Sequence, residues 1–217
     1  MPFSVSTGLI AAAGLLAASL ATPGAASAEP VRIVALGDSL TAGYGLPEAQ
    51  AFPTKLQAAL KAKGYDVEIV NAGVSGDTAA DGLARLDWSV PDGTDGVILE
   101  LGANDMLRAQ DPGRTKADLD AILTRLGARR IPVLVAGMLA ARNLGPDYGA
   151  RFDALFPALA KAHGALLYPF FLDGVATDPA LNQADGLHPN ARGVDVIVAR
   201  ILPSVEALIA EARTRHP

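Results

Sequence analysis

The stretch "VRIVALG" (residues 31–37) is an almost continuous run of apolar side chains that ends in a glycine. The segment "FPTKLQAALKAKG" (52–64) follows, with a proline in its first turn, apolar residues at helical spacing and a closing glycine. The segment "DGVILELG" (95–102) is the most strongly apolar run of the chain after residue 28. Strands that are apolar throughout are typical of a parallel sheet that is covered on both faces. The sequence therefore predicts an α/β fold.

The same alternation of short apolar runs and amphipathic segments continues to the end of the chain. We expect Thr115 to cap the third of the long helical segments and Pro203 to kink the last one. No repeat or linker interrupts the pattern, so residues 29–217 are predicted to form one doubly wound domain. In such sheets ligands bind outside the carboxyl ends of the strands. The remaining strands are expected at 66–73, 131–138 and 165–170, and the helices at 76–88, 115–130, 146–164 and 190–213.

Residues 1–28 have the features of an export signal. The apolar run "LIAAAGLLAASLA" (9–21) is too short to span a bilayer, and "ASA" (26–28) fits a signal-peptidase site. No Lys or Arg precedes the run, which is unusual for such a signal. A buried N-terminal helix is the alternative. We expect cleavage after Ala28 and a periplasmic or secreted domain, with no stable membrane anchor.

Composition excludes several classes of partner and site. The 217-residue chain is 50% apolar and 19% charged, and its formal net charge is −5. A mildly acidic surface argues against nucleic acid or an anionic membrane as the main partner. The chain has no cysteine, so it has no disulfide, no thiol nucleophile and no thiolate metal site. No metal-ligand spacing is present, and we expect neither a metal nor an organic cofactor. The sequence does not determine the oligomeric state.

Three polar stretches follow the first three predicted strands. In "GDSLTAGYG" (37–45), Ser39 lies where the chain turns from strand to helix. Ser39 could be a nucleophile, although the G-x-S-x-G elbow of the α/β-hydrolases is absent. A phosphate-binding turn is the competing interpretation, but no P-loop or dinucleotide fingerprint is present. In "NAGVSGDT" (71–78), Gly76 can present its N–H to a ligand, and Ser75 is a weaker candidate nucleophile.

The third stretch is "ELGANDML" (100–107), in which Asn104 could donate its amide N–H groups to a developing oxyanion. Asp105 could brace this loop by accepting backbone N–H bonds. Each of these stretches is also ordinary turn chemistry when taken alone. Their weight comes from their common position at one edge of the predicted sheet.

The fourth stretch, "ADGLHPN" (184–190), contains one of three histidines. On a tight turn, Asp185 could accept a hydrogen bond from one ring nitrogen of His188, while the other faces Ser39. His216 adjoins the C-terminus, and His163 lies at the end of a predicted helix. Only His188 is placed to reach the common sheet edge.

These four stretches in this order resemble the four signature blocks of the SGNH (GDSL) hydrolase family. The resemblance covers nearly all of residues 29–217 and is greatest to the bacterial periplasmic branch of thioesterase I, arylesterases and lysophospholipases. It implies a flavodoxin-like three-layer α/β/α sandwich with a five-stranded parallel sheet in the order 2-1-3-4-5. Ala103 stands where many members of the family carry glycine, which affects the shape of the loop.

Carried over by residue, the resemblance implies that Ser39 is the nucleophile, His188 the base and Asp185 its orienting acid. The oxyanion hole would consist of the Ser39 and Gly76 backbone N–H groups and the Asn104 side chain. The implied activity is that of a serine esterase acting through an acyl-enzyme on a small-molecule ester or thioester.

The substrate is less constrained than the chemistry. Apolar residues in "GMLA" (137–140) and "YPFFLDGV" (168–175) suggest an acyl pocket for aryl esters and short-to-medium acyl esters, thioesters or lysophospholipids. They could equally close the core under a long loop. A carbohydrate O-deacetylase of the same family is the alternative, but Trp88 is the only tryptophan available to stack on a sugar. A non-catalytic phosphate- or flavin-binding module is a second alternative, because the architecture alone allows it.

Overall fold

The computed structural model describes residues 1–4 and 29–215. Residues 5–28 of the predicted signal peptide (1–28), which include its apolar run and "ASA" (26–28), lie outside these residues, as does His216. No helix in the described part is long and apolar enough to cross a membrane.

The core of the fold is a five-stranded sheet whose strands are all parallel. The strand order β2-β1-β3-β4-β5 confirms the order that the family resemblance implies. The central strands are the most apolar segments of the domain, and Val34 and Ile98 are completely buried. The strands are β1 (Val31–Gly37), β2 (Val67–Gly73), β3 (Gly96–Glu100), β4 (Val133–Ala136) and β5 (Leu166–Tyr168).

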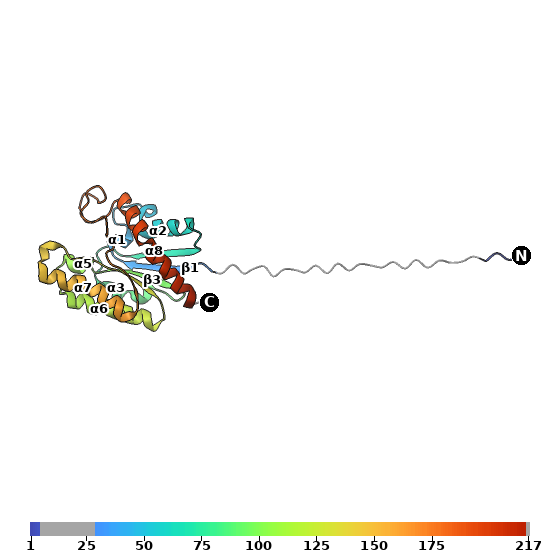
Figure 1. Cartoon of the computed structure of the whole chain (residues 1–217), viewed down its shortest axis with the longest axis horizontal. Coiled ribbons are helices and arrows are strands. Elements are labelled where there is room, and N and C mark those ends of the chain that lie inside the picture. Colours follow the sequence, from blue (N-terminus) through green and yellow to red (C-terminus); the bar gives the residue numbers. More distant parts are fainter. Residues whose placement is uncertain (5–28, 216–217) are drawn as a thin grey trace.

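Helices cover both faces of the sheet, which makes the expected three layers (Figure 1). Helices α2 (Phe52–Ala62) and α8 (Ala191–Arg215) pack together on one face. On the other face, α6 (Pro112–Ala128) packs against α3 (Ala79–Ala84) and α7 (Pro146–His163). The shorter helices are α1 (Ser39–Ala42), α4 (Leu86–Ser89) and α5 (Ala103–Leu107), with 3₁₀ turns η1 (Glu48–Gln50) and η2 (Arg142–Leu144).

One predicted helix start is wrong. Helix α6 begins at Pro112, and the side chain of Asp111 caps it by accepting the Gly113 N–H at 2.8 Å. Thr115 is instead buried inside the helix. An aspartate followed by a proline is a strong helix start, because the fixed φ of proline suits the first turn. The last helix, α8, runs on through Pro203.

The segment predicted as one weak helix over 76–88 forms two short ones, α3 and α4. Thr78 and Asp81 form a capping box at the start of α3: the Asp81 N–H donates to the Thr78 hydroxyl, and the Asp81 carboxylate accepts the Thr78 N–H. This box fixes where the loop after β2 ends.

The strand register brings the polar loops together. Gly37, the last residue of β1, pairs with Gly73 of β2 on one side and with Glu100 of β3 on the other. The three central strands therefore end at the same level. Because they run parallel, the loops that follow them all emerge at one edge of the sheet.

Candidate active site

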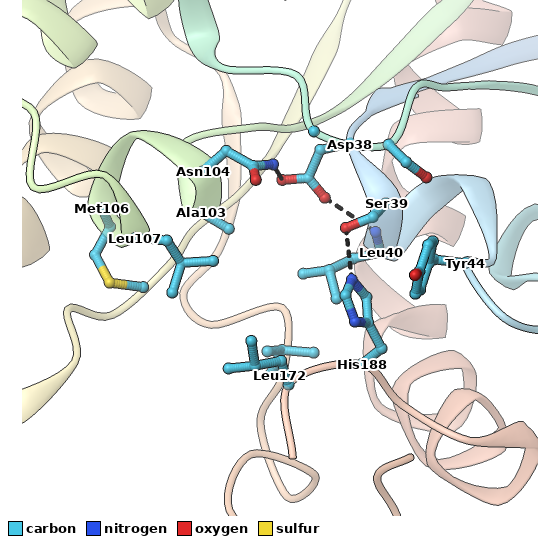
Figure 2. Close-up of a pocket in the computed structure, with 13 residues that line it drawn as sticks. Asp38, Ser39, Leu40, Tyr44, Ala103, Asn104, Met106, Leu107, Leu172 and His188 are labelled. Carbon is cyan, nitrogen blue, oxygen red and sulfur yellow. Dashed lines mark hydrogen bonds between the residues drawn. The ribbon is translucent and has the colours of Figure 1, made fainter. Parts of the chain in front are cut away.

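Ser39 is the first residue of α1, the single turn of helix that follows β1. The carboxylate of Asp38 caps this turn by accepting the Leu40 N–H at 2.9 Å. The turn ends at Gly43, whose φ of 81° is in the left-handed region. A strand that passes directly into one capped turn exposes the serine at the edge of the sheet (Figure 2).

Ser39, His188 and Asp185 form one hydrogen-bonded chain. His188 Nε2 lies 2.9 Å from Ser39 Oγ, and His188 Nδ1 lies 2.7 Å from Asp185 Oδ2. Figure 2 shows the imidazole directed at the serine hydroxyl from the loop before α8. The structure thus brings Ser39 together with Asp185 and His188, from which the sequence separates it by almost the whole domain.

The loop that carries His188 is built around the Asp185 carboxylate. Asp185 Oδ1 accepts the backbone N–H groups of Leu187 at 2.9 Å and His188 at 3.0 Å. The His188 and Leu187 N–H bonds, together with the His188 side chain, lower the pKa of Asp185 to about 2. An ionised carboxylate can only accept, so His188 carries its proton on Nδ1, and Nε2 is free to accept from the Ser39 hydroxyl.

The three expected oxyanion donors line one cavity with the serine. Among residues 29–215, the Ser39 and Gly76 backbone N–H groups have no protein acceptor. Gly76 has a φ of 92°, which a side chain would strain. Its carbonyl accepts a hydrogen bond from Arg108 at 2.8 Å, and this bond fixes the orientation of the turn.

Asn104 reaches the same cavity from α5, but its amide group is already engaged. Nδ2 donates to Asp38 Oδ2 at 3.0 Å and to the carbonyl oxygen of Asp77 at 2.9 Å. These bonds hold the amide rigidly beside Ser39 (Figure 2). For Asn104 to act on an oxyanion, one of its N–H groups must be shared with the substrate oxygen.

The buried carboxyl groups of Asp38 and Asp105 hold the loops of the site through hydrogen bonds. Asp105 accepts the Ala79 N–H at 2.9 Å and the Thr115 hydroxyl at 3.1 Å, as expected for a loop brace. Asp38 has no exposed surface, and its burial raises its pKa to about 6. The Asp38 carboxyl lies between the serine turn and Asn104, so it couples two parts of the site.

A mostly apolar cavity of about 300 Å³ opens over Ser39. Of the two segments predicted to form an acyl pocket, "GMLA" (137–140) contributes no lining residue, and "YPFFLDGV" (168–175) contributes only Leu172. Met138 and Phe171 are buried in the core instead. The apolar lining comes mainly from the polar loops and short helices that carry the candidate site residues. Its members are Leu40, Tyr44, Ala103, Met106, Leu107, Leu172 and Leu187.

The other candidate residues from the sequence, Ser75, His163 and Trp88, are not part of the Ser39–His188–Asp185 chain. Ser75 lines the cavity, but the serine bonded to His188 is Ser39. His163 pairs with Asp120 at 2.8 Å at the end of α7. Trp88 is 82% exposed on α4 and does not line the cavity, so it cannot stack on a sugar bound there.

Sequence reasoning missed Arg85 as a structural element of this sheet edge. Its guanidinium donates to the carbonyl oxygens of Gly37 at 2.9 Å and Ala72 at 2.9 Å, and it pairs with the Asp77 carboxylate at 2.6 Å. Arg85 thus ties together the ends of β1 and β2 and the loop that carries Gly76. The sequence shows Arg85 only as a single basic residue eight positions after Asp77. Such a spacing is equally typical of an ion pair on the solvent-exposed surface, so it did not identify this role.

Within residues 1–4 and 29–215, no group of three or more His, Asp or Glu side chains is arranged to hold a metal ion. The polar groups at the cavity are the hydroxyl, imidazole, carboxylate and amide described above. Their arrangement can deprotonate an alcohol and hold a developing negative charge.

Comparison with known proteins agrees with this geometry. The model of the GDSL-like lipase/acylhydrolase family matches residues 35–196, which is most of the chain. The chain is 38% identical over 166 residues to an arylesterase of Vibrio mimicus, covering 76% of this chain and 83% of the relative. It is also 38% identical over 167 residues to thioesterase 1/protease 1/lysophospholipase L1 of Escherichia coli strain K12, covering 76% of this chain and 78% of that protein.

Among solved structures, the chain is similar to AlinE4, an esterase of the SGNH-hydrolase family. The two are 44% identical with a TM-score of 0.71, and the match covers 84% of this chain and 98% of AlinE4. Sequence family, fold and relatives all point to the same enzyme class. The chain therefore belongs to the GDSL-like lipase/acylhydrolase family and is a serine hydrolase of the SGNH type.

Proposed function

We propose that this enzyme hydrolyses carboxylic esters through an acyl-enzyme on Ser39, with His188 as the base and Asp185 as the acid that orients it. One observation carries the proposal: a single hydrogen-bonded chain joins the Asp185 carboxylate, the His188 imidazole and the Ser39 hydroxyl. A serine hydroxyl is a poor nucleophile until a neighbouring base accepts its proton, and this chain supplies that base in the required tautomer.

The reaction has two half-reactions. Ser39 Oγ attacks the ester carbonyl as its proton moves to His188 Nε2, and a bond forms between Oγ and the carbonyl carbon. When the tetrahedral intermediate collapses, the bond to the alcohol oxygen breaks, and that oxygen takes the proton from Nε2. Water then attacks the acyl-enzyme in the same way, with His188 again as base, and releases the carboxylic acid and free Ser39.

The negative oxygen of each tetrahedral intermediate is proposed to lie between the N–H groups of Ser39 and Gly76 and the Asn104 amide. The two backbone N–H groups are free to donate within the described protein. Asn104 contributes by sharing an N–H that it now directs at Asp38 or Asp77. Donors that are already fixed in place stabilise the transition state without a cost of reorganisation.

The substrates we propose are aryl esters and short-to-medium acyl esters, including thioesters and lysophospholipids. The apolar lining supports an acyl chain rather than a sugar, and a cavity of about 300 Å³ is at the small end of ligand pockets. The names of the relatives include arylesterase, thioesterase and lysophospholipase, and these activities are compatible with such a pocket. A carbohydrate O-deacetylase is less favoured, because Trp88 lies outside the cavity.

We further propose that the enzyme acts in the periplasm or outside the cell after cleavage behind Ala28. The support is the sequence of residues 1–28, with its short apolar run and small residues at the cleavage site. N-terminal sequencing of the exported protein tests this directly, with Glu29 expected as the first residue.

A fluorophosphonate probe tests the assignment of the nucleophile, because it forms a bond only with an activated serine. We expect rapid labelling of the wild type and of Ser75→Ala, slow labelling of His188→Ala and none of Ser39→Ala. Labelling of Ser39→Ala, or loss of labelling in Ser75→Ala alone, would move the nucleophile away from Ser39. A p-nitrophenyl ester series run beside acetylated xylan then separates the esterase from the deacetylase.

A further inference from the structure

Tyr44 occupies a position beside the catalytic imidazole that the mechanism above does not use. Its ring centroid lies 4.5 Å from that of His188, and the two planes are inclined by 37°. Figure 2 shows Tyr44 on one side of the Ser39–His188 pair and Asn104, Met106 and Leu107 on the other. The cavity therefore has an aromatic side and an aliphatic side, with the serine between them.

The backbone of Tyr44 is fixed by both segments that carry the reacting groups. Its N–H donates to the Ser39 carbonyl at 3.1 Å, and its own carbonyl accepts from the Gln183 side chain at 2.7 Å. Gln183 also donates to the Pro189 carbonyl at 3.0 Å, next to His188. The backbone that carries the ring is thus held in place by the serine turn and the histidine loop together.

The Tyr44 ring is available to a ligand. The residue is 53% exposed although it borders an apolar cavity, and its hydroxyl has no hydrogen-bond partner in the described part of the chain. A tyrosine whose role was to fill the core would be buried, as Tyr168 is at 8% exposed.

The chemistry of the reaction determines which part of an ester lies near Tyr44. The leaving alcohol oxygen must take its proton from His188 Nε2, so the alcohol portion departs alongside the imidazole. The carbonyl oxygen points to the proposed oxyanion donors, of which Asn104 lies on the other side of the Ser39–His188 pair from Tyr44 (Figure 2). The aliphatic side chains Met106 and Leu107 lie on that other side too (Figure 2).

We propose that Tyr44 forms a subsite for the alcohol portion of the ester and favours leaving groups that carry an aromatic ring. This inference rests on the proposed function, and it assigns the two halves of the substrate to opposite sides of the cavity. An aromatic ring beside Tyr44 can stack against it, which a saturated ring of the same size cannot do equally well.

Two pairs of esters test the assignment. Benzyl acetate and cyclohexylmethyl acetate carry an aromatic or a saturated ring on the alcohol. Methyl phenylacetate, an isomer of benzyl acetate, and methyl cyclohexylacetate carry the same rings on the acid. For each variant we compare kcat/KM for the aromatic ester with kcat/KM for the saturated ester of the same pair, and the ratio of the two is the readout. This ratio does not depend on the fraction of active enzyme.

For Tyr44→Leu we expect the benzyl-to-cyclohexylmethyl ratio to fall about two- to tenfold, the range of an aromatic pair. The phenylacetate ratio should stay at its wild-type value, and Tyr44→Phe should keep both ratios. Leu107→Ala is the matched control: it is also 53% exposed and lines the aliphatic side, so it should leave the benzyl ratio unchanged.

Two outcomes overturn the proposal. An unchanged benzyl ratio in Tyr44→Leu means that Tyr44 does not contact the alcohol, and a fall in the phenylacetate ratio means that it contacts the acyl portion. In both cases the enzyme still hydrolyses esters, so the proposed function stands. If instead wild-type protein that is folded hydrolyses none of the four esters and no p-nitrophenyl ester, the proposed function itself fails.

Discussion

The carboxyl group of Glu100 accepts a hydrogen bond from the Thr41 hydroxyl at 2.7 Å in the interior between β3 and the serine turn. It also accepts the Asp38 N–H at 3.4 Å, while its other oxygen has no partner in the described protein. Glu100 is completely buried. Burial, and then the nearby Asp38 carboxylate, raise the pKa of Glu100 well above its usual value of 4.5. The raised pKa favours the protonated form of the Glu100 carboxyl, which contacts the turn that presents Ser39 through Thr41 and Asp38.

Glu100→Gln tests this protonation. The native state keeps the proton at pH values where the unfolded chain has lost it, so wild-type stability falls as pH rises above the unfolded pKa of 4.5. Glutamine keeps the carbonyl acceptor and has no proton to lose. The free energy of unfolding of the variant, relative to wild type, should increase as the pH rises above the unfolded pKa of 4.5 in urea titrations. A constant difference would mean that Glu100 is ionised in the native state.

Removal of Ser39 or His188 should abolish most of the rate. By analogy with other serine hydrolases, Ser39→Ala and His188→Ala should lower kcat by roughly 10⁴–10⁶-fold. The double variant should be about as slow as either single one, because the two residues act as a unit. Turnover of p-nitrophenyl esters by purified protein measures this, and wild-type turnover in Ser39→Ala would contradict the mechanism.

Asp185→Asn should disturb the tautomer of His188 rather than the fold. Asparagine can still cap the loop by accepting the Leu187 and His188 N–H groups, but it is no longer an anion beside the ring. We expect kcat to fall by up to about 10⁴-fold with little change in KM. The native carboxylate, with a pKa of about 2, stays ionised throughout the working range. The wild-type pH profile of kcat should therefore show no change from titration of Asp185 above about pH 4.

Asn104→Ala should lower kcat by about 10²–10³-fold if the amide helps to hold the oxyanion. The same change removes a donor from the buried Asp38 carboxylate, so Tm should be measured alongside. Asn71→Ala is the matched control, because Asn71 is an exposed asparagine near the end of β2 and does not line the cavity. An equal loss of kcat in both variants would argue against an oxyanion role.

Leu172→Trp should shorten the acyl chains that the enzyme prefers. Leu172 lines the cavity of about 300 Å³, and an indole there would fill much of it. In a p-nitrophenyl ester series, kcat/KM for acetyl esters should change little, while that for longer chains should fall. Leu139→Trp serves as control, since Leu139 is 46% exposed outside the cavity. A uniform loss over all chain lengths would place the acyl chain elsewhere.

Much of the fold was predictable because it depends on local patterns. The all-apolar strands and amphipathic helices gave the α/β class, and the four polar stretches gave the candidate site. The helix start at Thr115 was wrong because the local signal that begins this helix, Asp111 followed by Pro112, was overlooked. Thr115 is instead used inside the domain, where its hydroxyl donates to Asp105. The acyl lining was mostly misplaced because Met138 and Phe171 are apolar but face the core.

The sequence by itself determined the layered fold, the order of the polar turns and the identity of the residues that can do acyl-transfer chemistry. Composition and short-range periodicity depend only on neighbouring residues, so they can be read directly along the chain. Only the tertiary structure decided that Glu100 lies beneath the serine turn, that Asn104 is tied to Asp38 and that Tyr44 packs on His188. Contacts across β1, β3 and the loop before α8 are fixed by strand register and packing, and no local pattern encodes them.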